Sequence, residues 1–263
     1  MSGRAARARR SSGGRAAEPQ ADLVREQRVG RIAGVAGMVG VAGTVAALLV
    51  AARSSAGGSG SSAIDRARQL RDFHADVSGQ ALALGLRVLA LVATIALALF
   101  LARAVIDRGG RDGTALRVLA VAGPLALVAA LVVGFVAIRD VADAYAAGAP
   151  SPDRADRLWD DSGLLRATGI GEIAAHLVFG VWLIWLSLRA MAVGLLTRVL
   201  GYWGIAAGVV GVVLPLGDTL FMGWLASVAL LAWGWWPGGL PLAWTTGRAV
   251  PWDIPIESGA AAR

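Results

Sequence analysis

Residues 171–217 read GEIAAHLVFGVWLIWLSLRAMAVGLLTRVLGYWGIAAGVVGVVLPLG. Two long apolar runs, 170–188 and 199–216, make up most of this stretch, and a short turn flanked by Arg189 and Arg198 separates them. Each run has close to the roughly 20 residues that a helix needs to cross about 30 Å of hydrocarbon. Because backbone polar groups in lipid must be satisfied internally, the pattern predicts two membrane-spanning helices joined by a turn.

The composition extends this prediction to the whole chain. Of 263 residues, 56% are hydrophobic and 16% are charged, and the mean hydropathy is +0.63. The apolar residues form unbroken runs instead of the periodic pattern of a soluble core. We therefore predict an all-α fold, an integral membrane bundle of six transmembrane helices within residues 32–236. The expected spans are 32–52, 81–102, 116–138, 170–188, 199–216 and 219–236.

The segments outside the spans differ in character. Residues 1–31 hold eight arginines and predict a disordered cytoplasmic tail, and 237–263 predict a cytoplasmic tail that contains proline and tryptophan. Residues 64–77 predict a short surface helix with Leu70 and Phe73 on its apolar side. The acidic segment 139–168 is expected to be a solvated loop.

Glycines in two spans predict close helix packing. In the first span they recur every three residues and so wind around the helix, which favours contact with more than one neighbour. In the fifth span a 3-4-3 rhythm keeps them on one face, which predicts one tight helix–helix contact. The two sets are Gly34, Gly37, Gly40 and Gly43, then Gly201, Gly204, Gly208 and Gly211.

The arginines predict the orientation. With both termini inside, the inner segments hold 16 arginines and the outer segments hold 8. Because positive residues concentrate on the cytoplasmic side, we predict a multi-pass protein of the plasma (inner) membrane with cytoplasmic N- and C-termini. The net charge of +7 is then explained by these loops, so no nucleic-acid partner is predicted.

The sequence offers no recognisable catalytic apparatus. It contains no cysteine and two histidines, and it lacks a phosphate-binding loop, a His-Glu-x-x-His pair and a Gly-x-Ser-x-Gly elbow. We therefore predict no enzymatic activity, no catalytic residues, no cofactor and no metal site.

Four ionisable residues fall within or beside the predicted spans: Arg87, Glu172, His176 and Asp218. Glu172 and His176 lie one helical turn apart, and all four belong to the outer half of the predicted bundle. One hypothesis is a polar pocket open to the outer face, with Arg87 balanced by Glu172. The alternatives are a structural Arg–Glu pair that fixes two helices, or an Arg87 that extends to the interface.

Two stretches carry a family resemblance. Residues 190–201 read AMAVGLLTRVLG, and residues 236–244 read WPGGLPLAW, followed by Gly247 and Pro251-Trp252. They resemble motifs of an uncharacterised family of polytopic integral membrane proteins from actinobacteria. The chain departs from that pattern at five positions: Arg189, Ala192, Leu242, Arg248 and Asp253. The resemblance covers most of residues 30–253 and implies a fold and a topology, but no activity.

These observations lead to two functional interpretations. The first is a non-enzymatic structural or partner-binding membrane component, in contact with the lipid bilayer and with a possible protein partner through its C-terminal tail. The second is a small-solute or proton transporter that uses the outer polar cluster.

Overall fold

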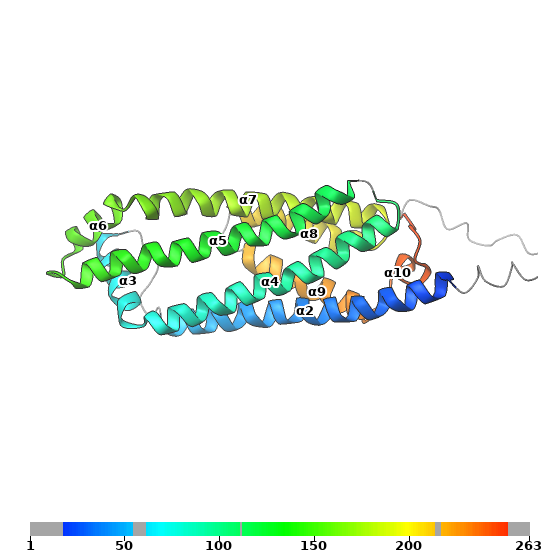
Figure 1. Ribbon diagram of the computed structural model, residues 1–263, viewed down its shortest axis with the longest axis horizontal. Coiled ribbons are helices and arrows are strands. Elements are labelled where there is room, and N and C mark those ends of the chain that lie inside the picture. The colour runs from blue at the N-terminus through cyan, green and yellow to red at the C-terminus, as the bar shows by residue number, and fades with distance from the viewer. Residues whose placement is uncertain (1–17, 55–61, 111, 214–216, 252–263) are drawn as a thin grey trace, which may run out of the picture.

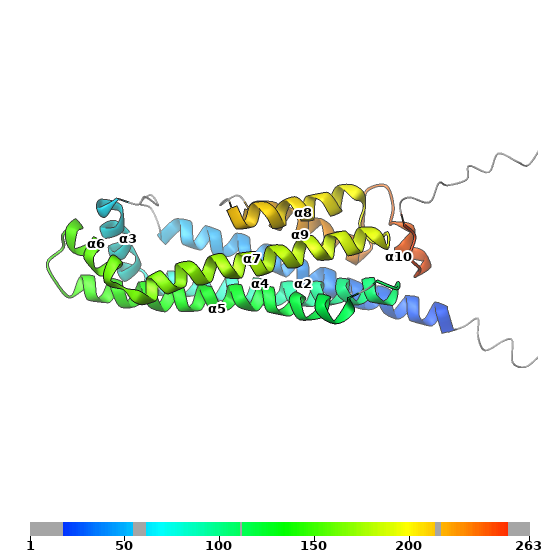
Figure 2. The ribbon, with the colours of Figure 1, turned by 90° about the horizontal axis from the view of Figure 1, so that it is seen from above.

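The computed structural model describes residues 18–54, 62–110, 112–213 and 217–251, and this part of the chain contains helices and no strands (Figure 1). The long helices run side by side along one axis, with shorter helices beside them and at both ends (Figures 1 and 2). In chain order the helices are α2 (Glu18–Ser54), α3 (Ala63–Ala75), α4 (Val77–Asp107), α5 (Gly113–Ala146), α6 (Pro152–Asp161), α7 (Gly163–Ala192), α8 (Arg198–Val213), α9 (Gly217–Trp233) and α10 (Leu242–Thr246).

The long helices and the α8–α9 hairpin form a closed ring. α2 packs on α4, α4 on α5, α5 on α7, α7 on α8, α8 on α9, and α9 packs back on α2. Each of these six helices therefore packs mainly on two neighbours and turns one face inward, while its other face carries exposed apolar side chains such as Leu89, Ile173 and Val199. An outward apolar face of this kind suits a lipid environment.

Four helices are long and apolar enough to cross a membrane by length and composition: Leu23–Arg53, Val77–Asp107, Gly113–Ala146 and Gly163–Ala192. They match the first four predicted spans and are compatible with a multi-pass membrane protein. The fifth and sixth predicted spans form shorter apolar helices, α8 with 16 residues and α9 with 17. At 1.5 Å per residue these two are about 24–26 Å long, against about 45–51 Å for α4, α5 and α7.

The two ends of the bundle differ. We call the end that carries α10 and the start of α2 the tail end, and the end that carries α3 and α6 the cap end (Figures 1 and 2). The α8–α9 hairpin starts at the tail end and stops part-way along α7 (Figure 2). Six helices therefore surround the interior near the tail end, and four continue to the cap end.

The glycine predictions for the first span are confirmed. A Cβ added at Gly34 would meet Ala229 and Trp233 of α9, whereas one added at Gly43 would meet Ala90 and Leu86 of α4. Gly37 and Gly40 face both neighbours at once. The spacing of three therefore lets α2 approach α4 and α9 together, as small residues in membrane helices commonly do.

At the cap end, α3 and α6 cover the end of α5. The prediction for the surface helix is confirmed, because Leu70 and Phe73 are buried in a small core with residues of α5 and α6. The expectation of a solvated loop at 139–168 is wrong, since α5 continues to Ala146, α6 follows, and α7 already starts at Gly163. Arg66 joins α3 to α6 through Asp156 at 2.9 Å and lies over the ring of Trp159 at 5.7 Å.

At the tail end the flanking segments are built into the bundle. α2 begins at Glu18, so residues 18–31, expected to be disordered, are helical; residues 1–17 lie outside the described part. Trp244 of α10 is buried, donates its indole N–H to the Leu195 carbonyl at 2.8 Å and stacks on Phe100. The C-terminal tail is thus packed against the ring as far as Val250, whose backbone N–H bonds the Val193 carbonyl at 3.2 Å.

A candidate binding cavity within the bundle

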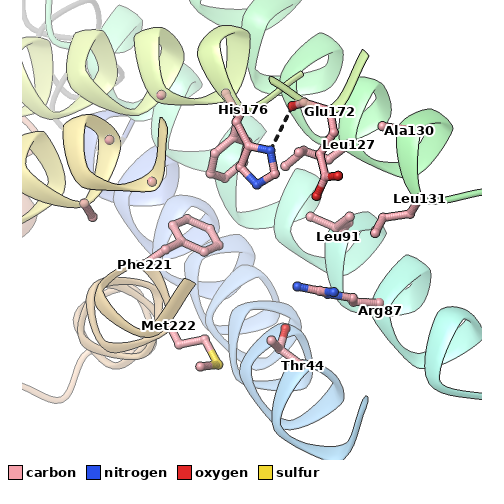
Figure 3. Close-up of a pocket in the computed structure, with 15 residues that line it drawn as sticks. Thr44, Arg87, Leu91, Leu127, Ala130, Leu131, Glu172, His176, Phe221 and Met222 are labelled. Carbon is pink, nitrogen blue, oxygen red and sulfur yellow. Dashed lines mark hydrogen bonds between the residues drawn. The ribbon is translucent and has the colours of Figure 1, made fainter. Parts of the chain in front are cut away.

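A cavity of about 80 Å³ lies inside the ring at the level where the α8–α9 hairpin ends (Figure 3). Its walls come from α2, α4, α5, α7, α8 and α9. Three of the four predicted site residues line it: Arg87 from α4, and Glu172 and His176 from α7. A volume of this size holds several water molecules, because one needs only about 10–15 Å³ of such space.

A second cavity of about 270 Å³ adjoins the first on the side of the cap end. It is lined by α2, α3, α4, α5 and α7, and it shares Arg87, Ala130, Leu131 and Glu172 with the first cavity. Phe73 of α3 lines this second cavity, so the cap end contributes to its wall. Together the two cavities extend from the cap end into the middle of the bundle. Arg87 and Glu172 line both of them.

The end of the hairpin explains where the first cavity lies. Along α8, a Cβ added at Gly204 or Gly208 would collide with atoms of α7, whereas one added at Gly211 would meet nothing within 4 Å. Gly211 lines the cavity instead. The predicted glycine face is therefore a tight contact for most of its length, and it opens into empty space at its last glycine.

His176 has a defined hydrogen bond. Its Nδ1 lies 2.9 Å from the backbone carbonyl oxygen of Glu172, one turn earlier (Figure 3). A carbonyl oxygen accepts and cannot donate, so Nδ1 carries the proton and Nε2 of the neutral ring is left as an acceptor. The carboxylate of Glu172 is not used in this contact.

Arg87 and Glu172 face the same space from opposite walls (Figure 3). Among the described residues, no hydrogen bond or ion pair joins these two side chains. The arrangement thus places a guanidinium and a carboxylate around one cavity without locking them to each other. The side chain of Asp218, the fourth predicted member, lies outside the described residues, although its backbone belongs to α9.

Aromatic side chains close the cavity toward the tail end. Phe179 of α7 contacts Phe221 of α9 edge to face, with ring centroids 4.9 Å apart, and Phe221 stacks on Trp224. Trp182 packs on Phe179 and is 1% exposed. Within the described chain, the indole nitrogens of Trp182 and Trp203 and the hydroxyl of Ser187 are buried without a hydrogen-bond partner.

No protein-family model, curated protein or solved structure matches this chain. The site is therefore defined by its own geometry. In the described part of the chain, no three His, Asp or Glu side chains gather as a metal site.

Three of the four residues selected from the sequence, Arg87, Glu172 and His176, line one cavity. They were selected because ionisable side chains are unusual in apolar runs. Thr44, Phe221 and Met222 also line the cavity, but each is ordinary in a membrane helix and gives no signal of its own. Gly211 could be recognised only as the last member of a packing row.

Proposed function

We propose that this protein is a non-enzymatic solute-binding protein of the plasma membrane. Its ligand would be a small solute that enters the cavity at Arg87, Glu172 and His176 from the outer side. One observation carries the proposal: Arg87 of α4 and two side chains one turn apart on α7, Glu172 and His176, line adjoining cavities inside an apolar bundle. Charged groups in such surroundings are costly and typically serve a ligand, an ion or a partner.

The membrane placement belongs to the proposal. We infer six transmembrane helices, with α8 and α9 crossing most of the roughly 30 Å of hydrocarbon in spite of their length. Arg103, Arg189 and Arg198 flank the ends of α4, α7 and α8 at the tail end, which favours a cytoplasmic position for that end and for both termini. The cap and the wider cavity then face outward.

The chemistry of the walls indicates the class of solute. Arg87 offers a planar set of donors suited to a carboxylate or a phosphate. Glu172, when ionised, accepts from a cation, and Nε2 of His176 accepts a hydrogen bond. Leu91, Leu127 and Phe221 supply apolar walls. We therefore propose a zwitterion with a small apolar body, its anionic group toward Arg87 and its cationic group toward Glu172.

A thermal-shift experiment on the purified protein in detergent tests this proposal. Small zwitterions of graded size are compared with anions and cations of matching shape. A ligand at about 100 times its Kd should stabilise the protein by about 2.7 kcal/mol. Arg87→Gln and Glu172→Gln should each reduce the ligand-induced shift in unfolding temperature. A shift that neither substitution changed would overturn the proposed site.

A matched pair of glycine substitutions makes the test specific for the cavity. Gly211→Leu places a side chain in the cavity, whereas Gly85→Leu places the same side chain on an exposed face of α4, where an added Cβ meets nothing within 4 Å. The first should abolish the ligand-induced shift and the second should preserve it. If no zwitterion shifts the unfolding temperature, the structural or partner-binding role is the better description.

A transporter is the second candidate, and the buried polar atoms without partners favour it. Trp182, Ser187 and Trp203 lie on α7 and α8, on the same two helices as His176 and Gly211. Such atoms often mark places that water or a ligand occupies during function. Uptake of the stabilising zwitterion into proteoliposomes, reduced by Ser187→Ala, would support transport; binding without uptake would rule it out.

The family resemblance and the partner at the C-terminal tail stay proposals. Trp244 of the tail motif is buried and hydrogen-bonded, which gives the motif a structural use in this chain. A protein partner at this tail would contact the exposed side chains of Trp235 and Leu242 instead.

A further inference from the structure

We propose that a cleft at the tail end binds the phosphate group of an anionic phospholipid. The cleft has a volume of about 500 Å³ and lies between the start of α2, the end of α4 and the chain that follows α10. It is separate from the cavity at Arg87 and shares none of its residues. The inference therefore does not depend on the solute site at Arg87, although it rests on the membrane placement of the proposed function.

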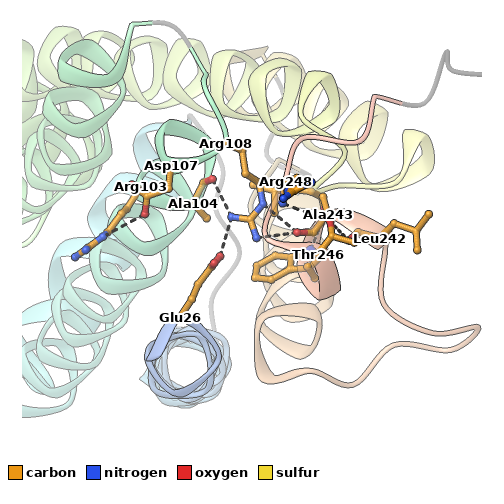
Figure 4. Close-up of polar contacts among 11 residues, drawn as sticks. Glu26, Arg103, Ala104, Asp107, Arg108, Leu242, Ala243, Thr246 and Arg248 are labelled. Carbon is orange, nitrogen blue, oxygen red and sulfur yellow. Dashed lines mark hydrogen bonds and ion pairs between the residues drawn. The ribbon is translucent and has the colours of Figure 1, made fainter. Parts of the chain in front are cut away.

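The walls of the cleft are held in place by a buried arginine. The side chain of Arg108, just past α4, is 0% exposed and bonds Glu26 of α2 at 2.7 Å (Figure 4). It also donates to the backbone carbonyl of Ala243 from Nε at 3.1 Å and from a terminal nitrogen at 2.8 Å. Three segments that border the cleft are thus joined at one point, so the cleft is preorganised.

The charges around the cleft leave a positive excess. Its five ionisable side chains are Arg25, Glu26, Arg103, Asp107 and Arg248. Glu26 is balanced by Arg108, and Asp107 lies 3.5 Å from Arg103 in an ion pair (Figure 4). Arg25 and Arg248 have no acidic partner among the described residues and stand on different walls of the cleft. A phosphate between them would bind both guanidinium groups.

The apolar part of the lining indicates a lipid as the source of that phosphate. Phe100, Val29 and Leu23 line the same cleft, and Phe100 lies just before the end of the apolar run 81–102. The cleft therefore lies where a membrane interface would meet the bundle, with apolar surface on one side and arginines on the other. Basic pockets between membrane helices at this depth typically bind anionic headgroups.

Titration with short-chain lipids tests the inference on the intact protein in detergent. Phosphatidylglycerol should raise the unfolding temperature at low concentration, and phosphatidylcholine, whose headgroup is zwitterionic, should do so only at much higher concentration. The double variant Arg25→Gln/Arg248→Gln should weaken the phosphatidylglycerol response roughly tenfold or more, because two phosphate contacts are lost.

The matched control is Arg28→Gln/Arg31→Gln. It removes two positive charges from the same end of the bundle, at exposed positions of α2 that do not line the cleft. An equal loss in both double variants would show general attraction to anionic surfaces and overturn the site. Glycerol 3-phosphate is the soluble comparison: if it matched phosphatidylglycerol in potency, the cleft would serve a soluble phosphate ester and the lipid assignment would be wrong.

Discussion

Arg108 and Arg87 belong to the same stretch of chain, about 30 Å apart along α4, and their surroundings are opposite. Arg108 is fully buried, and its donors reach Glu26, Ala104 and Ala243 at fixed distances. Arg87 is half-buried and lines two cavities with Glu172 opposite. The first arginine joins segments of the fold, and the second borders space that a ligand can enter. The difference separates a charge that joins segments of the fold from a charge that lines a cavity.

The largest effect is expected from Arg108→Leu. The substitution leaves Glu26, whose side chain is 22% exposed, without its cation and leaves the Ala243 carbonyl without its donors. Breaking a buried pair in this way costs about 3–5 kcal/mol. Thermal unfolding in detergent measures the loss, and adding Glu26→Leu should recover part of it. If Arg108→Leu cost no more than the loss of a surface ion pair, Arg108 would not have the structural role that distinguishes it from Arg87.

An intermediate effect is expected where the hairpin meets α7. A Cβ added by Gly208→Ala would lie 2.8 Å from the Gly180 carbonyl oxygen, so the two helices must separate, at a cost of about 1–3 kcal/mol. Gly211→Ala, three residues later, meets nothing and should be neutral or stabilising by up to about 1 kcal/mol. Similar unfolding temperatures for the two variants would argue against a packed contact that opens into a cavity.

The smallest effect is expected from a double-mutant cycle of Arg87→Leu and Glu172→Leu. Because no ion pair joins the two side chains to each other in the described structure, their coupling energy should stay below about 0.5 kcal/mol. Unfolding in detergent again provides the measurement. A double variant that recovered much of a large single loss would make these two charges a structural pair, like Arg108 and Glu26.

Local sequence patterns were sufficient for much of this fold. Hydropathy located α2, α4, α5 and α7, glycine spacing placed α2 against two neighbours, and Leu70 and Phe73 marked the apolar side of α3. The charged residues in apolar runs pointed to the cavity. Each of these features is expressed within one helix, where periodicity and composition are direct consequences of the surroundings.

The missed features depend on contacts between distant segments. Residues 18–31 are helical because Glu26 in this segment pairs with Arg108, which lies 82 positions later in the chain. The acidic segment 139–168 folds because α3 supplies an apolar surface for α5 and α6. The position along α7 at which the α8–α9 hairpin ends depends on the register of the hairpin against α7. Hydropathy carries no information about that register.

The bonds of Arg108 also set an order of assembly. Glu26 leaves the ribosome early, Arg108 follows after the first two long helices, and Ala243 comes near the end of synthesis. The guanidinium therefore reaches its full set of acceptors only when almost the whole chain has been translated. The tail end therefore cannot take its final arrangement before Ala243 has been translated.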